Sequence, residues 1–170
     1  MFGLFSCCSH PTSLLKSHLM ESDNIDVRQL VETDLTEWLR LRTALWDGTH
    51  EDDHKAEMLE IIEHGDSQAV FVADRGNGEL VGFLEASIRP FVEDCETDHV
   101  GYLEGWFVDP SHRQNGIGSA LVGLAESWAR DKGCTEMASD AEVGNELSLE
   151  AHRRLGYDVT SRLVHLRKAL

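Results

Sequence analysis

The spacing of apolar residues changes along the chain and predicts an alternation of strands and helices. Residues 24–30 alternate apolar and polar positions, as a half-buried strand does, and residues 69–73 form a short apolar run typical of a buried strand. Apolar residues at helical spacing follow Thr33, a candidate helix cap, and a second such pattern ends at Gly133. The predicted strands are 24–30, 69–73, 80–88, 100–108, 136–139, 157–160 and 162–167, and the predicted helices are 35–45, 52–64, 118–132 and 145–155.

This order of elements predicts a single α/β domain with one mixed, mostly antiparallel sheet and helices on both faces. A length of 170 residues suits one domain with one core. Residues 1–19 begin with an apolar stretch and carry their only lysine or arginine, Lys16, after it, which does not fit a secretory signal. We therefore assign 1–19 to an N-terminal extension, either disordered or foreign to the domain, and 20–170 to the domain itself.

The charge of the chain narrows the class of partner. Fifteen Lys and Arg residues against 31 Asp and Glu residues give a formal charge of −16. Such a surface repels nucleic acid and attracts a cationic small molecule, although solubility alone also accounts for many surface carboxylates. No apolar run approaches the roughly 18 residues of a membrane span. The four cysteines form neither a zinc-binding nor a disulfide pattern, so we expect a reduced, cytoplasmic protein.

Residues 108–119 carry the strongest chemical signal. A predicted strand ends in Asp109-Pro110, a polar loop follows, and a predicted helix begins near Gly118. Free backbone N–H groups and the positive end of a helix dipole make such a loop suitable for a pyrophosphate, and Gly116 and Gly118 would let the backbone approach it. A plain strand-to-helix connection remains the alternative. The sequence is neither a P-loop nor the dinucleotide-binding fingerprint.

Residues 113–118 (RQNGIG) match the Arg/Gln-x-x-Gly-x-Gly/Ala motif of the GNAT N-acetyltransferase superfamily, which the chain resembles over residues 24–168. The resemblance implies acetyl-CoA as co-substrate, with the loop cradling the pyrophosphate. It also implies that backbone N–H groups along 106–108 polarise the acetyl carbonyl. The cofactor-binding residues that it implies are Trp106, Phe107, Val108, Arg113, Gln114, Asn115, Gly116, Ile117, Gly118, Ser119 and Asn145.

Residues 85–89 (EASIR), 102–105 (YLEG) and 133–140 (GCTEMASD) resemble the aminoglycoside 6'-N-acetyltransferases of the chromosomal Acinetobacter and Salmonella type. This closer resemblance implies acetylation of the 6'-amine of aminoglycoside antibiotics, conferring resistance, in a homodimer. It implies a substrate site lined by Trp46, Glu104 and Asp140. His50 lies next to a family histidine position, and Phe91 stands where the family has tyrosine, so both are candidate substrate contacts.

The proposed reaction is direct transfer with both substrates bound. An ammonium group is not nucleophilic, so a carboxylate must remove its proton, and Asp140 and Glu104 are the candidates. His152 stands where many GNAT enzymes have a tyrosine that protonates the leaving thiolate, so it is the candidate acid. Tyr157 is the other nearby candidate acid, but we expect it to pack in the core, and we expect Cys134 to be a buried structural thiol.

Three alternatives stay open at this point. The amine acceptor of a true enzyme could instead be a polyamine, a lysine or a protein N-terminus, or the domain could serve only for binding. His50-Glu51-Asp52-Asp53-His54 also satisfies the His-Glu-x-x-His pattern of zinc proteases. It lacks apolar neighbours and an obvious third ligand, so we expect no metal.

Overall fold

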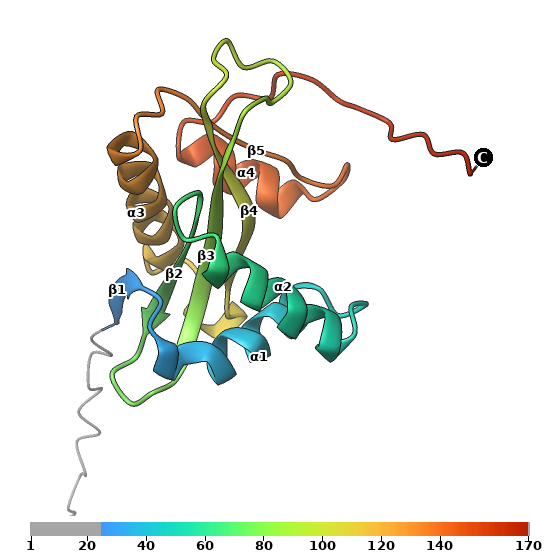
Figure 1. The fold of residues 1–170 in the computed structure, drawn as a ribbon. Helices are drawn as coiled ribbons and strands as arrows, with labels where there is room; N and C mark the ends of the chain where they lie inside the picture. Colours follow the sequence, from blue (N-terminus) through green and yellow to red (C-terminus); the bar gives the residue numbers. More distant parts are fainter. Residues whose placement is uncertain (1–24, 170) are drawn as a thin grey trace, which may run out of the picture.

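A five-stranded sheet organises the chain in the computed structural model, which describes residues 25–169. The strands are β1 (Asp26–Gln29), β2 (Gln68–Asp74), β3 (Leu80–Arg89), β4 (Val100–Val108) and β5 (Met137–Ser139), and they lie in this order across the sheet. The pairs β1–β2, β2–β3 and β3–β4 are antiparallel, whereas β4 and β5 are parallel. The predicted mixed, mostly antiparallel sheet is therefore confirmed (Figure 1).

Helices cover both faces of this sheet, as predicted. The helices are α1 (Leu35–Leu45), α2 (Glu51–Glu63), α3 (Ile117–Asp131) and α4 (Glu146–Arg154), with short 3-10 turns at Glu32–Asp34 and Pro110–His112. Alternate residues of β2 face opposite layers: Val70 and Val72 pack with α1 and α2, and Phe71 and Ala73 pack with α3. This explains the continuous apolar run of β2, because a strand covered on both faces has no polar side. Within residues 25–169 there is no helix long and apolar enough to cross a membrane.

The first helix begins differently from the prediction. Thr33 lies inside the 3-10 turn, and Asp34 is the residue that precedes α1. The Asp34 carboxylate accepts a hydrogen bond from the Val31 backbone N–H at 2.9 Å and binds Arg28 at 2.6 and 3.0 Å. Arg28 holds the pKa of Asp34 below its usual range, mainly through their hydrogen bond. The ion pair of Asp34 with Arg28 on β1, rather than a Thr33 cap, therefore fixes the start of α1.

The two closing strands predicted at 157–160 and 162–167 are wrong for the single chain. No strand is formed between residues 140 and 169, and every residue from 158 to 169 is exposed. The segment runs away from the body of the protein in Figure 1. Its apolar residues suit a strand, but a strand also needs a hydrogen-bonding neighbour, and no part of residues 25–169 pairs with this segment. The assignment of 1–19 to an extension lies outside the described residues.

Candidate active site

A bulge in β4 turns Glu104 out of the regular sheet. Glu85 of β3 pairs with Gly105 and Ala86 pairs with Leu103, so Glu104 is the extra residue on β4. A bulge of this kind re-aims side chains, and it is often found beside active sites. Glu104 is exposed on an otherwise buried stretch of the strand.

Beyond the bulge, β4 diverges from β5. The two strands pair only from Gly101 to Leu103 on β4, so within the described chain Trp106–Val108 have no strand neighbour on that side. These are the residues predicted to present backbone N–H groups to the acetyl carbonyl. The sheet therefore leaves backbone hydrogen-bonding groups open where the cofactor is expected.

The predicted pyrophosphate loop follows the end of β4 and leads into α3. Gly116 is the residue before the helix and has φ of 80°, a conformation that favours glycine. Gln114 also has a positive φ, of 64°. Nothing lies within 4 Å of the position that a Gly116 Cβ would occupy, and Arg113 donates a hydrogen bond from Nε to the Val108 carbonyl at 2.8 Å. The loop is thus open to solvent at Gly116 and joined to β4 by the Arg113 hydrogen bond. Its backbone N–H groups lie at the start of a 15-residue helix, an arrangement that suits binding of a pyrophosphate.

Gly118 has a packing role in addition to the one expected from the sequence. A Cβ at this position would lie 2.6 Å from the Trp106 ring. The same indole meets His152 edge to face, with ring centroids 5.5 Å apart. Because Gly118 has no side chain, the Trp106 ring of β4 can pack against the start of α3 and, on another side, against His152 of α4. Trp106 thereby connects β4, α3 and α4, three elements that carry predicted cofactor-binding residues.

His152, the candidate acid, has a defined hydrogen-bonding pattern. Its Nδ1 lies 2.8 Å from the Ser148 carbonyl oxygen, which can only accept, so Nδ1 carries a hydrogen. Its Nε2 is buried and has no hydrogen-bond partner within residues 25–169. In the neutral ring Nε2 is consequently an acceptor, and only the imidazolium form can donate a proton from it. Asn145 caps α4 by accepting the Ser148 N–H at 3.1 Å.

A cleft of about 450 Å³ lies on the α1 and α2 side of the sheet. Two predicted substrate residues, Trp46 and Glu104, line it. Gly105 is necessary for the position of Trp46, because a Cβ there would lie 2.4 Å from the indole ring. The other lining residues are Arg42, Thr49, His54, Glu57, Glu60, Ile61, Gln68, Glu85 and Ala86. Four carboxylates against one guanidinium make this an acidic cleft.

Behind this cleft lie buried polar groups that were not predicted from the sequence. Arg42, His54 and Glu85 are all buried. The one available signal was Glu85, since a carboxylate inside the apolar run of β3 requires a partner. Burial raises the pKa of Glu85, and the adjacent Arg42 guanidinium opposes that shift.

The two candidate bases are connected through Arg89 and Tyr102. Glu104 accepts hydrogen bonds from Arg89 at 3.0 and 2.5 Å and from the Ser87 hydroxyl. The Arg89 guanidinium lies 3.5 Å from the centre of the Tyr102 ring. Burial, reinforced by the charge of Asp140 beside it, raises the pKa of Tyr102 to about 12. Tyr102 therefore stays protonated at physiological pH, next to an exposed Asp140 at the end of β5.

The other predicted substrate residues, His50, Phe91 and Asp140, are not among the residues that line the cleft. His50 is exposed and precedes α2, whereas His54 is fully buried, so the two histidines of the His-Glu-x-x-His pattern face different environments. No group of three His, Cys, Asp or Glu residues suited to a metal occurs between residues 25 and 169. Phe91 is 69% exposed, on the connection between β3 and β4.

Tyr157 and Cys134 lie in packed surroundings, as expected. The Tyr157 hydroxyl donates to Glu126 at 3.4 Å, and burial raises the pKa of the phenol. Cys134 is buried, which also raises the pKa of its thiol. The Tyr157 ring also packs edge to face against His152, with ring centroids 5.5 Å apart.

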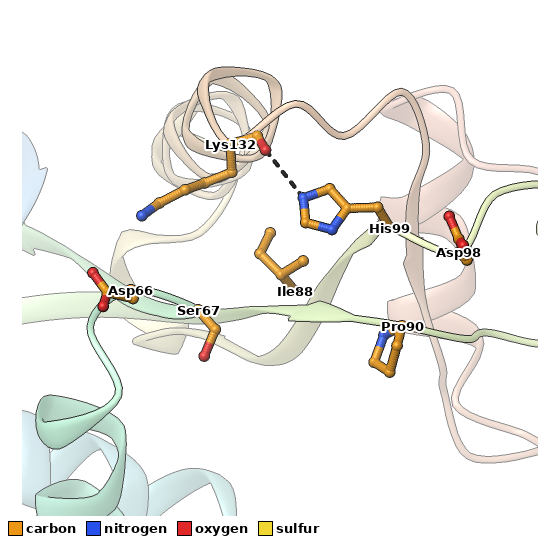
Figure 2. A pocket seen from close by; sticks show the side chains of 7 residues that line it. All are labelled: Asp66, Ser67, Ile88, Pro90, Asp98, His99 and Lys132. Carbon is orange, nitrogen blue, oxygen red and sulfur yellow. Dashed lines mark hydrogen bonds between the residues drawn. The ribbon is translucent and has the colours of Figure 1, made fainter.

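A second, smaller cavity of about 240 Å³ lies beyond the end of β3 (Figure 2). His99 spans its rim with a 3.0 Å hydrogen bond to the Lys132 carbonyl at the end of α3. The remaining lining residues are Asp66, Ser67, Ile88, Pro90 and Asp98. None of the predicted site residues lines this cavity, whereas Trp46 and Glu104 line the acidic cleft.

Comparison with known proteins agrees with this geometry. Residues 34–157 match the Acetyltransferase (GNAT) family. The aminoglycoside N(6')-acetyltransferase type 1 of Klebsiella aerogenes is 43% identical over 147 residues, which are 85% of this chain and 96% of that protein. The enzyme of the same name from Acinetobacter baumannii is 38% identical over 145 residues, 85% of this chain and 98% of that protein.

Solved structures give the same result. A structure of AAC(6')-Iy with the bisubstrate analogue CoA-S-monomethyl-acetylneamine is 40% identical, with a TM-score of 0.81 over 86% of this chain and 99% of that chain. AAC(6')-Ih from Acinetobacter baumannii is 37% identical, with a TM-score of 0.80 over 86% and 99%. With this fold, this loop and these relatives, the chain belongs to the GNAT family of acetyltransferases.

Proposed function

We propose that this enzyme transfers the acetyl group of acetyl-CoA to the 6'-amine of aminoglycosides, and thereby confers resistance to these antibiotics. The observation that carries the proposal is the acidic cleft beside the open part of β4. Aminoglycosides are polycations, and a cleft lined by four carboxylates and one guanidinium attracts and orients them. The relatives at 35–43% identity carry the name of this activity.

The cofactor side fits acetyl-CoA. The open loop at Gly116 and the start of α3 offer N–H groups and a helix dipole to the pyrophosphate. Along Trp106–Val108, the N–H groups that point away from β3 meet no strand among the described residues, and they would polarise the acetyl carbonyl. Acetyl-CoA supplies the activated acetyl group, and most of the rate gain on the protein's side comes from orienting the acceptor amine toward it.

We favour Asp140 of the two candidate bases, although only Glu104 lines the acidic cleft. Glu104 is held at both oxygens by Arg89, so its charge is already compensated. Asp140 is exposed and faces the protonated hydroxyl of Tyr102. We assign proton removal from the acceptor ammonium to Asp140, directly or through water, and electrostatic attraction to Glu104. His152, as imidazolium, would protonate the leaving thiolate from Nε2.

A thiol-release assay tests the proposal. Purified protein with acetyl-CoA is offered kanamycin, tobramycin, spermidine and a lysine peptide, and release of coenzyme A is followed. We expect turnover with the two aminoglycosides, at kcat/KM values well above those measured with spermidine and the peptide. Equal or greater turnover with spermidine or the peptide would instead assign the enzyme to polyamine or protein acetylation.

The assembly that we propose is a homodimer, in the cytoplasm, without nucleic-acid or membrane partners. β5 is an edge strand of the described sheet, and an unpaired edge is a template for another chain. The segment beyond α4 exposes Val159, Leu163, Val164 and Leu166, the last at 92%. A second copy that pairs with this segment would bury these side chains and supply the strand neighbour that the single chain lacks.

A further inference from the structure

Arg42 of α1 is the centre of the buried polar group behind the acidic cleft. Its Nη1 donates to Glu85 Oε1 at 2.6 Å, and the Trp38 indole N–H donates to the same oxygen at 2.8 Å. Its Nη2 donates to Glu57, and its Nε lies 3.4 Å from His54 Nδ1. All three guanidinium nitrogens are therefore engaged, which fixes the plane of the group.

Two carboxylates share the Arg42 guanidinium. Arg42 and Glu85 are almost fully buried, with 3% and 5% of their side chains exposed. Glu57 is the second carboxylate, and 54% of its side chain is exposed. Arg42 therefore holds Glu57 at the surface of the cleft, where a cation of the acceptor can reach the exposed part of the side chain.

Arg42 also fixes the aromatic wall of the cleft. Its guanidinium lies 4.8 Å from the centre of the Trp46 ring, which packs between this group and Gly105. One residue thus positions both the aromatic surface and the Glu57 carboxylate.

His54 gives an independent indication that the cleft is built for a polar ligand. The residue is fully buried, lines the cleft, and has no partner for Nε2 among the described residues. Its Nδ1 faces Arg42 Nε, which always carries a hydrogen, so Nδ1 is the acceptor and the hydrogen of the neutral ring is on Nε2. A buried N–H donor without an acceptor among the described residues leaves an unsatisfied polar group in the lining of the cleft.

We infer that Glu57 is a second ammonium-binding carboxylate of the acceptor cleft, held in place by Arg42, and that it binds a charged amine other than the one that is acetylated. Glu57 lies on α2, which packs on β2 and β3 through Met58, whereas Asp140 follows β5. The two carboxylates thus serve different parts of the acceptor. The inference rests on the proposed function, since it requires an acceptor with several ammonium groups.

The test compares two acceptors in the full-length enzyme: kanamycin A, with four amines, and methyl 6-amino-6-deoxyglucoside, with one. Glu57→Gln should raise KM for kanamycin A by about 3- to 10-fold at low salt, with kcat within about twofold, because a partly exposed ion pair is lost. It should leave kcat/KM for the monoamine unchanged. Glu63→Gln is the matched control, because Glu63 is exposed on the same helix and lies outside the cleft lining. It should leave KM and kcat unchanged for both acceptors.

Arg42→Lys separates positioning from binding. Lysine keeps the charge that Glu85 needs but has no planar fork to hold Glu57 at the same time. It should raise KM for kanamycin A as Glu57→Gln does, and the double variant should add little further. Equal behaviour of Glu57→Gln and Glu63→Gln toward kanamycin A, or an equal loss with both acceptors, would overturn the inference. A wild-type enzyme that acetylates no aminoglycoside would remove the proposed function and this inference with it.

Discussion

Arg89 binds Glu104 through both carboxylate oxygens, with Nε–Oε1 at 3.0 Å and Nη2–Oε2 at 2.5 Å. The pair fixes the Glu104 side chain beside the acidic cleft. Asp140, which follows β5, is exposed and lies next to the Tyr102 hydroxyl. The different roles that we propose for these two carboxylates can be separated by mutation.

Asp140→Asn should lower kcat/KM for an aminoglycoside by about 10²–10⁴-fold, because an amide cannot take the amine's proton. The affinity for coenzyme A should hardly change.

Glu104→Gln should mainly raise KM for the aminoglycoside, since it weakens attraction of the polycation, and high salt should mimic this change in the wild-type enzyme. Steady-state kinetics with calorimetry of coenzyme A binding makes the distinction. Asp131→Asn, an exposed change at the end of α3, is the control, and wild-type kinetics in both site variants would remove these roles.

Gly116→Val should weaken coenzyme A binding by several-fold or more. Valine at φ of 80° is strained, so the loop must change its conformation, and its N–H groups would turn away from the pyrophosphate. Gly123→Val is the matched control, because Gly123 is exposed in α3 with nothing within 4 Å of its Cβ position. Calorimetry that finds the same affinity in both variants would contradict a cofactor role for the loop.

The sequence predicted those features of the fold that depend on local pattern. The apolar run of β2 and the helical spacing of α3 each reflect one element packed on its neighbours. Gly133 at the end of α3 has φ of 92°, in line with its prediction as a helix stop. Local pattern cannot show whether a neighbour exists, which is why the apolar alternation after α4 predicted strands that the single chain does not form.

Part of the site depends on pairs far apart in the sequence. Arg42 and Glu85 are 43 positions apart, and the residues around each of them do not indicate that the two form an ion pair. Glu104 was recognised through family resemblance, but the bulge that re-aims it depends on its register with β3. The Gly-rich loop was readable because its glycines and the following helix are contiguous.

Asp34→Asn should cost about 1–3 kcal/mol of unfolding free energy at pH 7, because its charged hydrogen bonds with Arg28 are largely buried. Arg28 lowers the pKa of Asp34 in the folded protein. The stabilisation is therefore present above the unfolded-state pKa, near 3.8, and is lost as pH falls through the lower folded-state value. Urea unfolding at pH 7 and below pH 4 should show the difference from wild type shrinking with acid. Asp26→Asn, exposed on β1, should show no such trend.

The last prediction concerns the exposed segment after α4. If a second copy covers it, Leu163→Asp with Leu166→Asp should convert a dimer to a monomer, because each charge would have to be buried without a partner. Light scattering after size-exclusion chromatography measures the mass directly. Since dimer stability depends on protomer concentration, the wild type should also melt at higher temperature when concentrated, and the variant should not. Thr160→Asp places a charge at a polar, exposed position of the same segment and should leave the dimer intact. A wild-type protein that is monomeric at micromolar concentration would refute the assembly. A wild-type dimer that survives both leucine changes would move the interface elsewhere, and the apolar residues after α4 would then need another partner.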